Sequence, residues 1–485
     1  MNITLPLRTV RARNVPFDRF YLFSFAWAVA NVLHALSFPD RISWEQPWAV
    51  AVVLAAALVL LAPHNTWFFL LMLGCSMANT LSWIPYTPNH ILFELLVNGG
   101  ILLSFGWALA RSYRSGTSWS SIGASLRHNW YAAFAPMARL SLCALYFWAV
   151  FHKLNWDYFN VQISCSTYLL DGYNQRLPFL PDFPTWAHWL AVWGTLLIEA
   201  AIPVLLCLRK TRLAGILLGF GFHYFLALHP HPGLYSFSGL MFALYMLFIP
   251  AQVPAKMEAL AHTVLASYRA PVLLAGRVVI CVVVIGIVGL GLQGIISPGF
   301  LIWLIWGMLL ATVCVLVIYR HAFVLETPAR LLRVRPVALW IIPVLIFFNG
   351  LTPYLGLKTQ TSFSMFSNLR VEGERSNHLF IPASVQLTSM AKDLVEIVDT
   401  NLETLQPFVL QNQLITFFEL RRLTSEAAAS NTDFQVKYLH HNDLQIVQVV
   451  DGESTRPEVT KPHNWLTAKL IRFRPVDKGP CLCKH

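Results

Sequence analysis

The sequence GFLIWLIWGMLLATVCVLVIY occupies positions 299–319 and contains no charged side chain. An α-helix needs roughly 20 apolar residues to cross the hydrocarbon of a bilayer, so this stretch is long enough for one transmembrane helix. The same criterion predicts further spans at 20–38, 47–62, 67–83, 91–110, 134–151, 186–208, 213–228, 233–250, 278–296 and 336–352. We therefore expect an α-helical polytopic membrane bundle of about 11 spans. The exact number around 47–83 stays open, because 47–62 is short and only four residues separate it from the next span.

Composition supports the same class of protein. The chain has 485 residues, of which 56% are hydrophobic and 12% charged, whereas soluble domains are about 25% charged. With a mean hydropathy of +0.55, these values exclude a soluble globular enzyme, a disordered protein and a coiled coil. The net charge of +11 belongs to residues 1–351, which hold 21 basic and 10 acidic residues, because the remaining 134 residues hold 14 of each. The basic excess is therefore typical of membrane loops and not of a surface that binds nucleic acid.

The distribution of basic residues predicts an orientation. If the N-terminus is cytoplasmic, the loops and termini on that side carry 17 Lys and Arg residues, and the opposite loops carry only Arg41, Lys153 and Arg176. This asymmetry predicts a multi-pass protein of the cell (inner) membrane with a cytoplasmic N-terminus and an outer, periplasmic or lumenal, C-terminal part. No small-residue cleavage site follows a short apolar region near the N-terminus, so the first span is expected to be retained.

Two domains are expected, a membrane domain at 1–352 and a small extramembrane α+β domain at 353–485. The stretches 434–439 and 444–450 alternate like strands on either side of a turn at Asn442-Asp443. The stretch 414–420 is a candidate third strand, and 391–410 has a more helical pattern.

The segment 358–378 follows the last span directly and mixes polar residues with Phe and Met. It is expected to lie against the outer membrane face, either as a lid or wall of an outer site or as a juxtamembrane connector with aromatic anchors. Three cysteines are expected on the same, oxidising side, namely Cys165, Cys481 and Cys483. A disulfide among them is compatible with that location, and their pairing stays open.

Lys153 is the most informative polar residue, because it ends the fifth span on the outer side. Its side chain can extend to lipid phosphates, pair with Asp157 on the next turn, or lie desolvated as a general base, since burial disfavours the charged form of a lysine. Other polar side chains fall at or near the outer ends of spans or inside them. They are Asn89, His90, His152, His229 and His231 near the ends, and Asn31, His34, Glu94, Glu199 and His223 within the spans.

These positions favour one outward-facing polar site beneath the outer domain, although each histidine alone is explained by a hydrogen bond between helices. Metal binding is not expected. His229 and His231 alternate with prolines, and no carboxylate lies close to them in the sequence.

The stretch FHKLNWDYF at 151–159 resembles the HTTM group, the membrane region that vitamin K-dependent γ-carboxylases share with many bacterial proteins. The Asn89-His90 pair, the Phe222-His223 pair and a β-containing domain after the spans agree with this resemblance, which covers roughly residues 15–350. It implies that Lys153 is the base that deprotonates a reduced quinone of the vitamin K or menaquinone type, after which an epoxide forms and a glutamate is carboxylated. It also implies that His90 or His223 hydrogen-bonds the quinone oxygen or the developing anion.

The chain departs from the carboxylase pattern in three places. Its tail is much smaller than the lumenal part of those enzymes, the segment 358–378 does not match them, and Asn155 stands where they usually have Asp. The expectation is therefore an outward-facing site for a quinone or lipid-like substrate. Lys153, His90 and His223 are its catalytic candidates, and Asn89, His152, Glu199, His229 and His231 are its substrate-binding candidates.

Two other classes of function remain. A non-enzymatic lipid or quinone binder or transporter would use Glu199, Glu94 and His34 along its pathway, and a scaffold would bind a protein partner through the outer domain. A protein or peptide substrate on the outer side fits the carboxylase reading. No phosphate-binding Gly-rich motif with Lys-Ser or Lys-Thr is present, so no nucleotide cofactor is expected.

Overall fold

The computed structural model describes residues 17–43, 45–114, 119–179, 181–266, 297–321 and 323–483. Within them, five helices are long and apolar enough to cross a membrane, which supports the assignment as a membrane protein. They are α1 (Arg19–Ser37), α4 (Asn89–Arg114), α5 (Trp119–Phe151, apolar from Ser125), α8 (Thr185–Cys207) and α13 (Pro298–Arg320).

Fewer spans are shown than the eleven expected from the sequence. Three predicted spans form apolar helices of only 15 residues, which at 1.5 Å per residue cover about 22 Å of a hydrocarbon layer about 30 Å thick. These are α2 (Pro47–Leu61), α9 (Arg212–Leu226) and the 3₁₀-plus-α segment of η2 (Val337–Trp340) and α15 (Ile341–Leu351). The predicted spans 67–83 and 233–250 form α3 (Thr66–Trp83) and α10 (Pro232–Met246), neither of which is among the five. The predicted span 278–296 lies outside the described residues.

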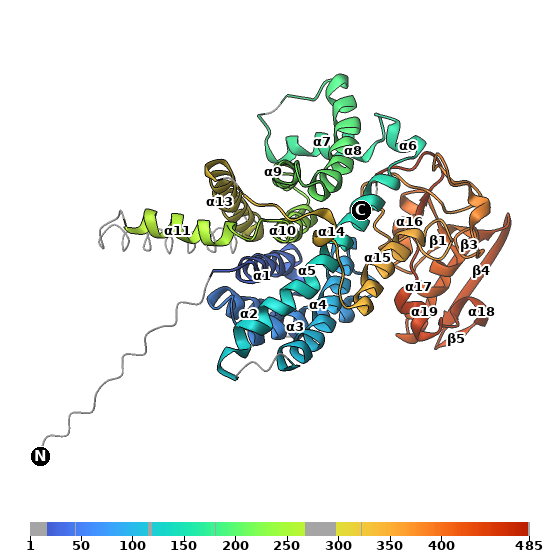
Figure 1. Ribbon diagram of the computed structural model, residues 1–485. Coiled ribbons are helices and arrows are strands. Elements are labelled where there is room, and N and C mark those ends of the chain that lie inside the picture. The colour runs from blue at the N-terminus through green and yellow to red at the C-terminus, as the bar shows by residue number, and fades with distance from the viewer. Residues whose placement is uncertain are drawn as a thin grey trace, which may run out of the picture.

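Helix α10 lies at the centre of the bundle, beside α1, and nearly all of its residues are buried (Figure 1). Small residues permit this close packing. A methyl group at Gly239 would lie 2.7 Å from Cδ1 of Leu33, so an alanine here would require that side chain to move. Short helices join the bundle at its edges: α6 (Trp156–Phe159), α7 (Cys165–Arg176), α11 (Val253–Ala266) and α14 (Pro328–Leu331).

The contact between α5 and α15 depends on a second glycine. A Cβ at Gly350 would lie 2.3 Å from the ring of Trp148, a buried side chain. We expect Gly350→Ala to lower the free energy of unfolding by about 1–3 kcal/mol, the usual cost of overpacking. Thermal unfolding in detergent measures it. Gly106→Ala in α4 is the matched control, because no atom lies within 4 Å of its new Cβ, and it should be neutral or slightly stabilising. Equal stability of the two variants would contradict the packing argument.

The C-terminal part contains one antiparallel sheet with strand order β5-β4-β3-β1-β2-β6, and α17 packs on one face of it. The strands are β1 (Leu394–Thr400), β2 (Gln413–Thr416), β3 (Phe434–His440), β4 (Asp443–Val450), β5 (Glu453–Ser454) and β6 (Val476–Asp477). The helices are α16 (Gln406–Leu410), α17 (Phe417–Ala429), α18 (Pro457–Thr460) and α19 (Trp465–Leu470).

The predicted hairpin is confirmed, but its turn lies one residue earlier than predicted, at His441 and Asn442, both at positive φ, because Asp443 already pairs with His440 in the sheet. The helical prediction for 391–410 was wrong over its first half, which forms the central strand β1. There Val395 and Ile397 are buried in the sheet core and the half-buried Glu396 lies between them, a period of two that the helical prediction overlooked. The candidate strand at 414–420 is strand only to Thr416, whose hydroxyl then caps α17 by accepting from Glu419 N.

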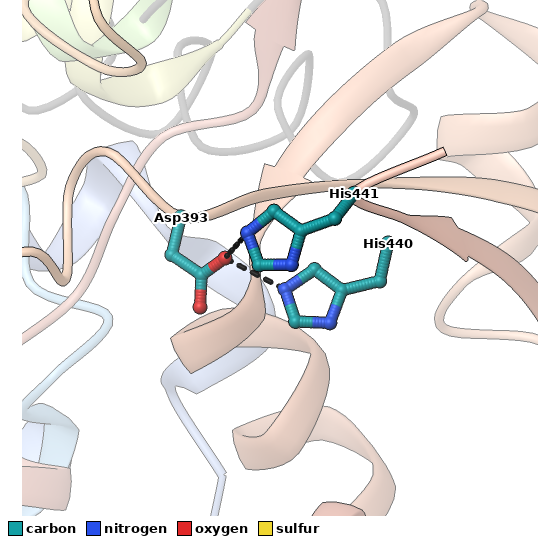
Figure 2. Close-up of side chains that lie close together, drawn as sticks. All are labelled: Asp393, His440 and His441. Atoms are coloured by element: carbon teal, nitrogen blue, oxygen red, sulfur yellow. Dashed lines mark hydrogen bonds and ion pairs between the residues drawn. The ribbon is translucent and has the colours of Figure 1, made fainter. Parts of the chain in front are cut away.

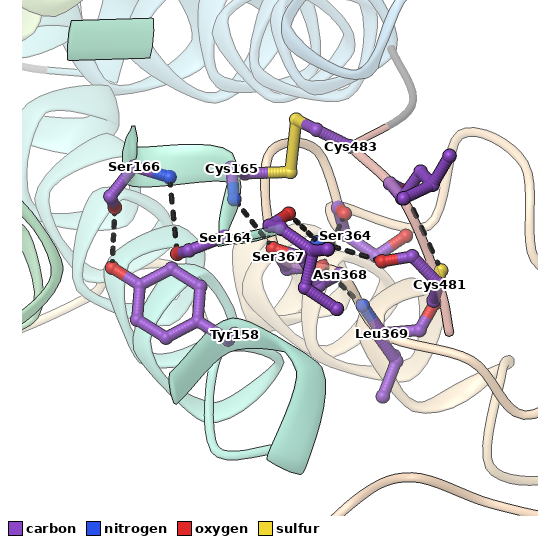
Figure 3. The surroundings of a disulfide bond; sticks show 12 residues. Tyr158, Ser164, Cys165, Ser166, Ser364, Ser367, Asn368, Leu369, Cys481 and Cys483 are labelled. Atoms are coloured by element: carbon purple, nitrogen blue, oxygen red, sulfur yellow. Dashed lines mark hydrogen bonds between the residues drawn. A yellow bond between two sulfur atoms is a disulfide. The ribbon is translucent and has the colours of Figure 1, made fainter. Parts of the chain in front are cut away.

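The sheet domain lies against one end of the bundle, where α5 and α15 end and α4 begins (Figure 1). Thr361 donates to the carbonyl of Thr87, and the His152 ring meets the Tyr354 hydroxyl at 2.9 Å. A disulfide joins Cys165, at the start of α7, to Cys483, and the buried thiol of Cys481 lies outside this bridge and donates to the carbonyl of Leu369 (Figure 3). The expectation of a bridge among the three outer cysteines is confirmed.

Candidate active site

A cavity of about 550 Å³ lies between α5, α7, α8, α9 and α10, at the end of the bundle that carries the sheet domain. This volume is typical of a site for a small organic ligand. Most of its lining is apolar. The polar side chains in the wall are Tyr146, Lys153, Ser166, Tyr173, Thr195, Glu199 and His223. The cavity therefore suits a largely apolar ligand that has one polar end.

An ion pair between Lys153 and Glu199 lies in this wall. Lys153 Nζ is 2.7 Å from Glu199 Oε2, and the two side chains are 4% and 13% exposed. Nζ also donates to the carbonyl of Ala149 at 3.2 Å. Because an ion pair in apolar surroundings is weakly screened, each charge depends strongly on its partner.

Two of the three roles considered for Lys153 are thereby corrected. Its buried ammonium does not extend to lipid phosphates, and its partner is Glu199 instead of Asp157. Asp157 accepts from Asn377 Nδ2 at 2.8 Å and from the backbone N–H of Cys481 at 3.0 Å. Its carboxylate therefore holds the C-terminal region and does not face the cavity.

A second polar group is centred on His223 and Tyr146. The Tyr146 hydroxyl lies 3.0 Å from His223 Nε2 and also hydrogen-bonds the hydroxyl of Tyr245. His223 Nδ1 lies 3.5 Å from Ser238 Oγ. Tyr146 was not among the predicted site residues, although it lies in α5 seven residues, or about two helical turns, before Lys153, which follows the end of this helix. That spacing is the signal that could have identified it.

The segment 358–378 forms part of the cavity wall, which is the geometry that the lid-or-wall reading expected. Phe363, Met365 and Phe366 line the cavity. Asn89 Oδ1 accepts from Phe363 N at 2.6 Å, so this predicted site residue positions the wall and is not itself in the lining. Four non-glycine residues of the segment adopt positive φ, an uncommon conformation that surrounding hydrogen bonds must maintain: Thr361, Phe363, Phe366 and Asn368.

Two asparagines hold this wall segment in place. Asn368 Oδ1 accepts from Cys165 N at 2.7 Å, and its Nδ2 donates to the carbonyls of Ile163 and Cys481 (Figure 3). Asn155, which is fully buried, donates to the carbonyl of Ser367 at 2.6 Å and to that of His152 at 2.8 Å. The turn that carries Lys153 and the wall opposite it are thus connected directly.

The cavity reaches the surface of the bundle along α8. Trp186, Leu190 and Phe225 line the cavity and are also 68%, 64% and 53% exposed. An apolar, exposed rim on a helix long enough to cross a membrane faces lipid when the helix is inserted. The open side of the cavity, along α8 and the end of α9, is therefore apolar.

His90 belongs to a separate polar cluster. Its Nε2 lies 3.0 Å from Ser236 Oγ, and its ring lies 5.3 Å from that of His34. His34 Nδ1 in turn lies 2.5 Å from Glu94 Oε2. The ring of Phe237 lies between His90 and His223, at 5.9 and 5.2 Å from them. The single polar site expected from the sequence is therefore divided in two by an aromatic side chain.

The remaining predicted residues, all histidines, have structural partners and are not in the cavity lining. Both ring nitrogens of His152 are engaged, by the Tyr354 hydroxyl and by the carbonyl of Ser362. His229 Nδ1 accepts from His231 N, and its ring lies directly over Gly172, where a Cβ would be 2.1 Å away. His231 Nδ1 accepts from Gly233 N and thus caps α10.

One cluster in the described residues has ligand types suited to a metal ion, and it lies in the sheet domain. His440 Nε2 is 2.7 Å and His441 Nε2 is 3.6 Å from Asp393 Oδ1 (Figure 2). The two imidazoles stack, and Phe417 stacks on the other face of His440. Asp393 is already hydrogen-bonded to His440, and none of the three residues lines the cavity.

Comparisons with known proteins add no family. No protein-family model matches the chain, and no curated protein or solved structure is detectably similar to it. The resemblance to the HTTM group therefore remains a prediction from the sequence, and the functional argument depends on the cavity itself.

Proposed function

We propose that this chain is an integral membrane enzyme that acts on a quinone or a similar lipid-soluble substrate, with Lys153 as its general base. One observation carries the proposal. Lys153 and the carboxylate that pairs with it, Glu199, line an apolar cavity of about 550 Å³ whose rim is exposed along a membrane-length helix. A buried, paired charge in such surroundings is costly to maintain and is most often found at a functional site.

The proton transfers follow from the distances. Glu199 lies within hydrogen-bond distance of Lys153 Nζ and can take its proton, which leaves a neutral amine facing the cavity. That amine then removes a proton from a hydroxyl at the polar end of the substrate. The Tyr146 hydroxyl and His223, 3.0 Å apart, form a second hydrogen-bonding pair in the same wall that can hold a substrate oxygen.

The resemblance supplies the chemistry that such a base would start. A reduced naphthoquinone, once deprotonated, reacts with O₂ to give the quinone epoxide and water, and in carboxylases this drives proton removal from a glutamate. The residues present fit the quinone in two respects, an apolar lining for the ring and chain and a lysine at the polar end. The positive-inside pattern supports an outer location for this end of the bundle, where a protein or peptide acceptor would meet it.

The alternative is a membrane protein that binds or transports a quinone or lipid without chemistry. It uses the same cavity. The pathway suggested for it would join Glu199 to Glu94 and His34, but Glu94 and His34 contact each other around a different, water-sized space of about 30 Å³. The geometry therefore favours the enzyme.

The proposal predicts that purified protein in detergent binds reduced menaquinone under argon and forms its epoxide when air is admitted. Gly194→Trp should reduce binding and epoxide formation at least about tenfold, because Gly194 lines the cavity and a large ring there fills it. Chromatography with mass detection measures both. Gly221→Trp is the control, since this glycine also has open space around it but lies outside the lining. Quinone that is bound but not converted to the epoxide would favour the binding protein. If the protein neither bound the quinone nor formed the epoxide, the proposal would be refuted.

A further inference from the structure

A small cavity between the bundle and the sheet domain is lined by basic side chains and by no acidic one. It measures about 40 Å³, which is room for roughly three water molecules. The loop before α4 forms one side through Ile84, Pro85 and Thr87, and the sheet domain forms the other. Three basic side chains line it, Lys358, Lys469 and Arg472, and no carboxylate does.

Two of these cations have no acceptor among the described residues. Lys469 Nζ donates to the carbonyl of Ile84 at 2.9 Å. The ammonium of Lys358 and the guanidinium of Arg472, by contrast, make no hydrogen bond or ion pair to any part of the chain that the structure describes, and the Arg472 guanidinium only stacks on the Tyr86 ring at 4.4 Å. Burial without a counter-charge lowers the pKa of Lys358 to about 8.

The nearest carboxylates are already committed. Glu419 and Glu426 both bind Arg422, at 2.7 and 3.0 Å, and Glu419 also accepts from the backbone N–H of Phe473. The junction therefore contains four basic side chains, the three that line the cavity and Arg422, but only two of the acidic ones just named, Glu419 and Glu426. Lys358 and Arg472 are half-buried, so water hydrates them only in part, and an anion in the cavity would supply the acceptor that the described residues do not.

From this charge balance we propose that the cavity binds one oxyanion of the phosphate class, held by Lys358 and Arg472. Its volume suits a single phosphate group and excludes a nucleotide. The cavity lies beside the loop that precedes α4. Because α4 is long enough to cross a membrane, lipid headgroups would lie near this end of the helix when it is inserted. The phosphate therefore comes either from a phospholipid headgroup or from free phosphate. Lys358, Gln360 and Thr361 also begin the wall segment of the large cavity, so the anion would fasten that segment at its root.

The test measures the melting temperature of the full, delipidated chain in detergent at constant ionic strength. Addition of inorganic phosphate, or of phosphatidic acid but not of diacylglycerol with the same acyl chains, should raise it by about 2–4 °C. Lys358→Met should abolish the rise and, because it removes an uncompensated cation, should melt at or above the wild type without anion. Lys461→Met, which alters an exposed lysine of the same domain, should behave like the wild type.

The experiments with inorganic phosphate and with phosphatidic acid distinguish free phosphate from a lipid headgroup as the source of the anion. A rise with free phosphate assigns a soluble anion, and a rise with phosphatidic acid alone assigns the headgroup. The absence of a rise in both arms would overturn the proposal, as would an equal rise in Lys358→Met. If Lys358→Met does not fold, Arg472→Gln makes the same comparison at the second unpaired cation, with the same expected loss of the rise.

Discussion

Replacing Lys153 with methionine is expected to reduce quinone turnover by at least about 100-fold, the usual contribution of a positioned general base. Methionine retains most of the length and apolar surface of the lysine side chain but cannot accept a proton. The cavity should therefore keep its shape and still bind the quinone. Single-turnover epoxide formation under substrate saturation measures the chemical step, and equilibrium binding of the reduced quinone measures the cavity separately.

A loss of turnover in Lys153→Met must be interpreted together with Glu199, the ion-pair partner of Lys153. Lys153→Met leaves a carboxylate in an apolar wall without its counter-charge, and breaking a buried pair in this way typically costs about 3–5 kcal/mol of stability. The double variant Lys153→Met/Glu199→Gln removes both charges and should recover much of that stability while remaining inactive. A double variant that turned over quinone normally would contradict the assignment of Lys153 as base. Recovery of stability without activity would separate the chemical role from the structural one.

Lys153 could be singled out from the sequence because its signal is local. A lysine at the end of an apolar span is costly, and the residues around it carry the resemblance to a known family. Glu199 was recognised for the same reason, as a charge deep within a span. Their contact could not be predicted, because 46 residues separate them and the packing of α8 on α5 brings them together.

The described residues show fewer helices of membrane-spanning length than the eleven predicted, and one reason is physical. Apolar windows report burial in general, and α10 is apolar because it lies in the centre of the bundle among other helices. The pairing of Cys165 with Cys483 and the separation of His90 from His223 by Phe237 likewise depend on tertiary contacts between distant segments. The sequence therefore identified which polar groups are costly to bury, but only the fold determined which of them are in contact.

Asn155→Asp is expected to destabilise the protein by about 3 kcal/mol or more, although Asp is the residue that the resemblance to carboxylases predicts here. The amide of Asn155 has two separate functions. Its oxygen caps α6 by accepting from Tyr158 N at 2.9 Å, and aspartate caps helices equally well. Its nitrogen donates to the carbonyls of His152 and Ser367, and an ionised carboxylate would repel both.

Because aspartate keeps the cap on α6, Asn155→Asp tests the two hydrogen bonds that the Asn155 amide donates. Each buried carbonyl left without a donor costs about 1–3 kcal/mol, and the new charge is fully buried. Thermal unfolding in detergent measures the loss. Asn160→Asp, five residues further along the chain, is the control, because this exposed amide only accepts, from Gln162 N at 3.2 Å, and should tolerate a carboxylate. If Asn155→Asp were as stable as Asn160→Asp, the amide would not be what joins the Lys153 turn to the wall segment. If it is destabilised as expected, the result means that this site presents carbonyl oxygens where a carboxylate would need donors.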